Sequence, residues 1–194
     1  MQKIGTVKFV QVQQDQMKAV EGDVRVYRPD PLQTVTSLHL TATGIVGIAS
    51  SGLKVTDVHN EAHPRSRYRG DNKISLGFVQ HYEQMRGRFG DHLKDGVGGE
   101  NIIIDTGGDL PAMHRYRRFF LKHGEQLTEL KRMIPAPPCR EFSVFCLQVP
   151  QCADEIKATL QFLADGLRGY YADVMPAPDQ AIVVQAGDEF LATL

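Results

Sequence analysis

Gly96-Val97-Gly98-Gly99-Glu100-Asn101 is followed without a break by Ile102-Ile103-Ile104-Asp105, so a glycine-rich turn leads into a run of isoleucines. Glycine adds no side chain and loses the most backbone entropy on folding, so three glycines in four residues indicate positive φ or a close neighbour. Three consecutive β-branched residues predict a short strand buried on both faces. The turn either presents a site, with Glu100 and Asn101 at its mouth, or only connects two strands.

Short strands are predicted on both sides of this run. They cover residues 6–12, 24–27, 35–40, 44–48, 169–174, 181–184 and 190–191, together with a hairpin of 119–121 and 127–130 that turns at His123-Gly124. One helix is predicted after an N-cap at Ser75, with Phe78, Tyr82, Met85 and Phe89 on one face, and another over 153–163, ending at Gly166. Many short strands with few helices favour a mainly β barrel or sandwich.

Charge and motifs exclude several classes of function. The chain has 194 residues, a net charge of −1 and a pI near 6.6, so no overall field favours nucleic acid or an anionic membrane. It contains no Walker-type phosphate loop, no dinucleotide glycine fingerprint and no Gly-x-Ser-x-Gly nucleophile elbow. A single domain over residues 1–194 is expected at this length.

The cysteines and the apolar runs indicate a cytoplasmic protein. The chain begins without the apolar stretch of a signal peptide, and no later run approaches the roughly 20 residues that span a bilayer. Three cysteines at unmatched spacings argue against a disulfide framework. The local context of Cys146 and Cys152 predicts packing thiols, shielded from solvent.

Cys139 is the most suggestive single residue. Pro135, Pro137 and Pro138 are expected to exclude regular structure just before it, and Arg140 supplies a neighbouring positive charge. A cation beside a thiol raises the thiolate fraction that a nucleophile, a persulfide carrier or a soft-metal ligand needs. The alternative is a small buried cysteine that behaves as a hydrophobe.

Polar residues before the glycine turn form a second candidate group. Asp57 and His59 share one face of an extended segment, although no further His or Cys follows at a zinc spacing. Arg65, Arg67 and Arg69 alternate in a loop that Lys73 follows, and these four residues are candidates for binding an anion. Guanidinium groups on an ordered loop suit phosphate or carboxylate, and the alternative is a solvated basic loop.

Taken in order, these pieces resemble the MOSC domain, the C-terminal domain of molybdenum cofactor sulfurase. The matching motifs are Asp57-Val58-His59, Lys73-Ile74-Ser75-Leu76, Gly98-Gly99-Glu100-Asn101-Ile102, the lone Cys139, and the tail Gly169-Tyr170-Tyr171-Ala172-Asp173-Val174 with Gly187-Asp188. They cover most of the chain. Two features depart from the family pattern: Thr56 precedes Asp57 where a glycine is usual, and the loop 60–72 is long and rich in arginine.

The resemblance implies a closed or partly open β-barrel with a few peripheral helices, and a site for the molybdenum cofactor (molybdopterin). Cys139 would be the catalytic residue, as metal ligand or persulfide site. The residues implied for binding the cofactor are Asp57, His59, Arg65, Arg67, Arg69, Lys73, Gly98, Gly99, Glu100, Asn101 and Arg140. No pyridoxal-phosphate domain fits in this length, so a sulfur or electron donor would be a separate desulfurase or reductase protein.

Two hypotheses of different classes follow. In the first, the chain is a sulfurtransferase or a molybdenum-dependent reductase of N-hydroxylated compounds that acts through Cys139. In the second, it is a non-catalytic β-barrel that binds an anionic metabolite or a partner protein.

Overall fold

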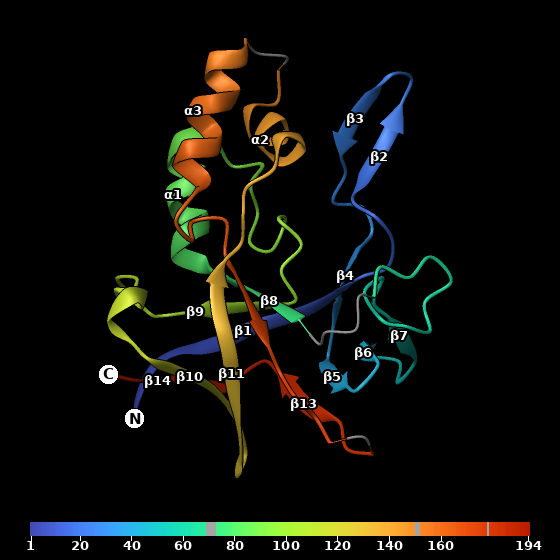
Figure 1. The fold of residues 1–194 in the computed structure, drawn as a ribbon, viewed down its shortest axis with the longest axis vertical. Helices are drawn as coiled ribbons and strands as arrows, with labels where there is room; N and C mark the ends of the chain where they lie inside the picture. Colours follow the sequence, from blue (N-terminus) through green and yellow to red (C-terminus); the bar gives the residue numbers. More distant parts are fainter. Residues whose placement is uncertain (69–72, 150–151, 178) are drawn as a thin grey trace.

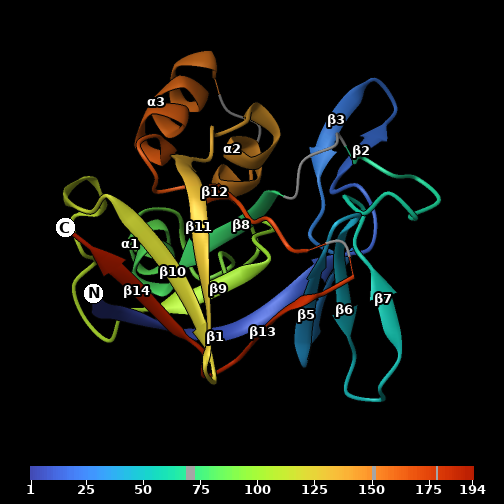
Figure 2. The same cartoon turned by 60° about the horizontal axis from the view of Figure 1, so that its bottom comes forward.

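Seven strands close into a barrel (Figure 1, Figure 2). The computed structural model describes residues 1–68, 73–149, 152–177 and 179–194. Around the barrel the order is β14 (Glu189–Thr193), β10 (Arg118–His123), β11 (Gln126–Pro135), β12 (Tyr170–Asp173), β8 (Lys73–Phe78), β9 (Ile102–Asp105) and β1 (Gln2–Gln13), and β1 pairs with β14. The β8–β9 pair is parallel and the other pairs are antiparallel. The prediction of a mainly β barrel is confirmed.

The long strand β1 also joins the barrel to a second sheet. Its far end, Val10–Gln13, pairs with β4 (Leu32–Val35). The second sheet contains β13 (Ile182–Gln185), β5 (Ser37–Thr41), β6 (Gly44–Ile48) and β7 (Lys54–Thr56), and a separate hairpin consists of β2 (Lys18–Glu21) and β3 (Val24–Tyr27). The strand predicted over 35–40 is confirmed in part. Residues 37–40 belong to β5, which pairs with β6 and β13, whereas Val35 is the last residue of β4, which pairs with β1.

Three α-helices in the described ranges lie at one end of the barrel (Figure 1). They are α1 (Val79–Phe89), α2 (Arg140–Leu147) and α3 (Ala153–Leu163), and a short 3-10 helix, η1, covers Met113–Arg115. None of the described helices is long and apolar enough to cross a membrane. α3 confirms the helix predicted there, whereas α2 was not predicted.

The helix predicted after an N-cap at Ser75 is wrong at its start. Residues 73–78 form β8, in which Ile74, Leu76 and Phe78 are buried at every second position, and the helix begins only at Val79. This alternation is the two-residue period of a strand, and the helical spacing of the aromatic residues takes over after it. Pro135 is likewise the last residue of β11 and not part of the irregular segment predicted before Cys139.

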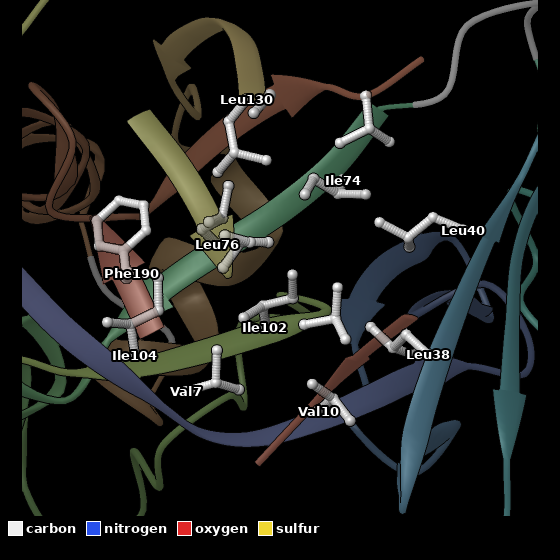
Figure 3. Close-up of a cluster of buried hydrophobic side chains, with 14 of the residues drawn as sticks. Val7, Val10, Leu38, Leu40, Ile74, Leu76, Ile102, Ile104, Leu130 and Phe190 are labelled. Atoms are coloured by element: carbon white, nitrogen blue, oxygen red, sulfur yellow. The ribbon is translucent and has the colours of Figure 1, made fainter. Parts of the chain in front are cut away.

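β9 separates two hydrophobic clusters, which explains its three consecutive isoleucines. Ile102 and Ile104 point into the barrel and belong to the cluster in Figure 3, which Leu38 and Leu40 of β5 join from the second sheet. Ile103 packs on the other side, in a cluster that includes Tyr82 of α1 and Phe142 of α2. All three isoleucines are 0% exposed, so the predicted burial on both faces is confirmed.

Candidate functional site

The glycine turn before β9 is held by a buried ion pair. Tyr82 donates its hydroxyl hydrogen to Glu100 Oε2 (2.6 Å) and accepts the Gly98 N–H (2.9 Å). The Arg168 guanidinium donates to Glu100 Oε1 and to the Gly98 carbonyl. Burial, reinforced by Glu100, raises the pKa of Tyr82 well above its ordinary value, so this hydroxyl stays protonated. Burial lowers the pKa of Arg168, but Glu100 together with the neighbouring tyrosines outweighs burial, and the pKa is raised.

Arg168 also links this turn to α2. Its guanidinium lies 4.6 Å from the centre of the Phe142 ring, which Tyr27 of β3 contacts edge-on at 5.0 Å. The Tyr27 hydroxyl donates to the Val97 carbonyl (2.9 Å), so the hairpin, the turn and α2 share one packed unit. Cys146 of α2 is 1% exposed, and burial raises the pKa of its thiol to about 12. It is a protonated packing residue, as predicted.

The glycines of this turn make room for side chains of the protein itself. Gly99 has φ +91°, and a Cβ there would overlap the Met17 side chain. A Cβ on Gly98 would lie 2.6 Å from both Arg168 and Glu100. Larger residues at either position would therefore displace the ion pair or the methionine.

Cys139 is a free, partly buried thiol at the N-cap of α2. Its carbonyl accepts the backbone N–H and the hydroxyl of Ser143, both at 3.0 Å. Glu141 follows it by two residues, and Lys18 Nζ lies 3.1 Å from Glu141 Oε2. Cys139 contributes to the pKa shifts of both side chains. The cation at the thiol therefore comes from β2, while Arg140 is exposed on the first turn of α2.

Lys18 and Glu141 stabilise each other in their charged forms. Burial lowers the pKa of Lys18, but the interactions with Glu141 and Cys139 together outweigh burial, and the pKa is raised. Burial raises the pKa of Glu141, but its own backbone N–H and the Lys18 ammonium outweigh burial and the pKa is lowered. An ammonium and a carboxylate thus stand beside the Cys139 thiol at neutral pH.

Asp57 and His59 contact each other, and Asp57 ties them to the end of the glycine turn. Asp57 is 0% exposed, and its Oδ1 accepts the His59 backbone N–H and lies 2.9 Å from His59 Nδ1. Its Oδ2 accepts the Gln13 N–H (2.8 Å) and the Asn101 amide (3.2 Å). Asn101 in turn accepts the Ser75 hydroxyl (2.8 Å). Because a carboxylate only accepts, Nδ1 of His59 carries the proton, and the half-exposed imidazole is held in one orientation.

The predicted basic loop is largely exposed where it is described. The Arg65 guanidinium lies 2.5 Å from the Asp15 carboxylate with 65% of its side chain exposed, and Arg67 is exposed. Arg69 and the side chain of Lys73 lie outside the described residues. No group of three or more His, Cys, Asp or Glu side chains in the described part of the chain is arranged to hold a metal ion.

Two surface hollows lie away from these residues. One is lined by Val79, Gln80, Glu83, Asp105, Gly107, Gly108 and Asp109, and the other by residues of β11 and of the segment from Met175 to Ile182. Neither includes Cys139. Cys152 is exposed at the N-cap of α3, so the prediction of a shielded thiol there is wrong. Ala153, Asp154 and Glu155, the first residues of α3, are exposed as well, because this end of the helix lies at the surface.

No local pattern in the sequence marked Lys18, Glu141, Tyr82, Tyr27 or Arg168 as neighbours of the site. Lys18, Tyr27 and Tyr82 reach it from other elements and Arg168 from the loop after α3, whereas Glu141 lies only two residues after Cys139. Arg168 stands directly before Gly169, the first residue of the MOSC-like tail motif, and that position is the one clue that the sequence offered.

Comparison with solved structures finds the same fold in proteins of low sequence identity. YuaD of Bacillus subtilis superposes with a TM-score of 0.54 at 11% identity, over 96% of this chain and 93% of YuaD. YiiM of Geobacillus stearothermophilus gives 0.52 at 16% identity, over 98% of this chain and 75% of YiiM. A crystal structure described as a hypothetical protein gives 0.55 at 14% identity, over 98% and 69%. No family model and no curated protein sequence matches the chain.

Proposed function

We propose that this chain is a MOSC-type protein that binds a pterin-based molybdenum cofactor and uses Cys139 to ligate the metal or to carry sulfur. The order of the sequence motifs supports the proposal, as does the barrel shared with YuaD and YiiM, both MOSC-domain proteins. The observation that carries it is the free, partly buried Cys139 at the start of α2, with Lys18 beside it.

The residues present fit such a group. A thiolate is a soft ligand, and a metal that the pterin already holds by its own sulfur atoms needs one such ligand from the protein. Lys18 and the exposed Arg140, Arg65 and Arg67 are cations that suit the cofactor phosphate. When bound, the cofactor would supply redox or sulfur-accepting chemistry, while the chain supplies binding, orientation and charge.

The test compares cofactor loading in two cysteine variants of the full chain. Each is produced in cells that make molybdenum cofactor, and molybdenum content and the fluorescence of the oxidised pterin are measured. Cys139→Ser keeps the size of the side chain but supplies a poor soft-metal ligand, so we expect bound molybdenum or transferable sulfur to be lost. Cys152→Ser, at an exposed thiol outside the site, should load as the parent does. Equal loading in both variants would remove Cys139 from the site.

A parent protein that loads neither metal nor pterin would contradict the proposal outright. The non-catalytic barrel that binds an anionic metabolite or a partner protein would then be the better description.

A further inference from the structure

The Lys18–Glu141 pair stands beside the Cys139 thiol and is accessible from solvent on one side. The Lys18 side chain is 45% exposed and that of Glu141 is 14% exposed, with Nζ and Oε2 3.1 Å apart. Cys139 is the N-cap of α2, two residues before Glu141, and it contributes to the pKa shifts of both side chains. A nucleophilic atom, an ammonium and a carboxylate thus meet where the β2–β3 hairpin packs against α2 (Figure 1).

The fold fixes the position of Lys18. Its partner across the hairpin is Tyr27, whose ring packs against Phe142 and Phe145 of α2 and whose hydroxyl binds the Val97 carbonyl. The hairpin is therefore anchored directly opposite Lys18. An anchored ammonium can recognise a ligand with a smaller loss of freedom than a mobile one.

Glu141 holds its carboxylate where an external anion would be favoured. The carboxylate accepts its own backbone N–H in the first turn of α2, binds Lys18 and interacts with Cys139. Negative charge is stabilised at a helix start, and the ammonium adds to that stabilisation. Because the carboxylate is at the end of a flexible side chain, rotation about the side-chain bonds of Glu141 would move it away from Lys18 without moving the backbone.

We propose that Lys18 is the cationic residue of an anion subsite at Cys139, and that the Glu141 carboxylate occupies this subsite until a ligand displaces it. The ligand class is a small molecule or cofactor group that bears an oxyanion, namely a carboxylate, sulfonate or phosphate. The inference deepens the proposed function and rests on it only in taking Cys139 as the reacting group. Neither the sequence motifs nor the MOSC resemblance assigned Lys18 or Glu141 to the site.

The experiment compares two alkylating reagents on the cofactor-free full chain. Iodoacetate is anionic and iodoacetamide is neutral, and both form the same S–C bond at the thiolate with loss of iodide. The ratio of their rate constants at Cys139, followed by mass spectrometry, cancels the ionised fraction of the thiol. It reports the charge that an incoming ligand meets beside the sulfur, and Cys152 on the same chain is the internal reference.

We expect Lys18→Met to lower the iodoacetate-to-iodoacetamide ratio at Cys139 about three- to ten-fold, the effect of one unit charge a few ångströms away. Lys18→Arg should retain the ratio, and Glu141→Gln should raise it because a competing carboxylate is removed. Lys54→Met removes the same charge at the exposed first residue of β7 and should leave the ratio unchanged.

An unchanged ratio in Lys18→Met would overturn the subsite, as would an equal fall in Arg140→Met or Lys54→Met. Failure of this inference is distinguishable from failure of the proposed function, because the ratio needs no cofactor. If the ratio falls in Lys18→Met but the protein never loads molybdenum, the anion subsite is supported and the proposed function is not.

Discussion

Glu100 is a buried carboxylate whose two oxygens are both used. Its side chain is 3% exposed and that of Arg168 is 14% exposed. Removing one partner of a buried ion pair leaves the other charge without compensation, which is far more costly than the net value of the intact pair. Removing one or both partners of this pair therefore measures how much the ion pair contributes to the stability of the glycine turn.

We expect Glu100→Gln to lower the free energy of unfolding by about 3–5 kcal/mol, measured in urea, because the Arg168 charge stays buried without its carboxylate. Glu100→Gln combined with Arg168→Met removes both charges. Its cost should be clearly smaller than the sum of the two single variants. Strict additivity would show that the two groups do not interact in solution.

Arg65 and Arg67 differ in whether an existing ion pair must be broken before the guanidinium can bind a phosphate. Arg65 already pairs with Asp15, whereas Arg67 is exposed. If the loop binds the cofactor phosphate, an alanine at either position should weaken binding by about 1.5–3 kcal/mol, the range for charge-assisted hydrogen bonds. Titration of the cofactor at several salt concentrations measures this. Binding that is indifferent to both substitutions would leave a solvated basic loop.

At the scale of elements, β9 carries the strongest prediction. Ile103 is 0% exposed, and Gly77 of β8 makes room for it, since a Cβ there would lie 2.9 Å from its Cδ1. We expect Ile103→Asp to cost more than about 4 kcal/mol in urea unfolding, because it buries a carboxylate with no partner. Ile103→Val should cost about 0.5–1.5 kcal/mol.

The matched control is the same change at an exposed isoleucine in a barrel strand. Ile134 of β11 is 51% exposed, so Ile134→Asp should cost much less than Ile103→Asp. Comparable losses at the two positions would mean that burial does not set the cost.

The elements that were predicted correctly from the sequence are those defined by the hydrophobic or turn pattern of neighbouring residues. The isoleucine run, the hairpin around His123-Gly124 and the amphipathic α3 are each defined by neighbouring residues. The start of α1 was missed because Ser75 suits an N-cap in isolation. In the fold its hydroxyl instead donates to Asn101 within the β8–β9 region, a contact that depends on tertiary pairing.

At the scale of the whole molecule, neither barrel closure nor the surroundings of Cys139 can be predicted from local sequence, because both depend on residues far apart in the chain. The β1–β14 pairing joins the two ends of the chain, and Lys18 and Cys139 interact although more than half of the chain separates them in sequence. Local pattern identifies Cys139 as a candidate because prolines and an arginine flank it. It cannot say which distant cation arrives: Lys18 comes from β2, while the adjacent Arg140 is exposed.

His81 links one buried group to the stability of the whole fold. It is 3% exposed between Phe78 and Tyr170, and its Nδ1 is the buried side-chain atom without a hydrogen-bond partner in the described residues. Burial lowers the pKa of its imidazole to about 4 from an ordinary 6.5. The unfolded chain therefore takes up a proton at a pH where the folded chain does not.

Stability should accordingly fall as the pH is lowered from about 6.5 to about 4, because proton uptake favours the unfolded state throughout this window. The pKa difference corresponds to about 3 kcal/mol. His81→Phe keeps an aromatic ring among aromatic neighbours and removes the titration. We measure the free energy of unfolding in urea at pH 7.5 and at pH 4. The loss of stability between these two pH values should be about 3 kcal/mol smaller in His81→Phe than in the parent. His114→Phe, at an exposed histidine, controls for the loss of one imidazole. If both variants track the parent equally, His81 does not govern the acid sensitivity of the fold.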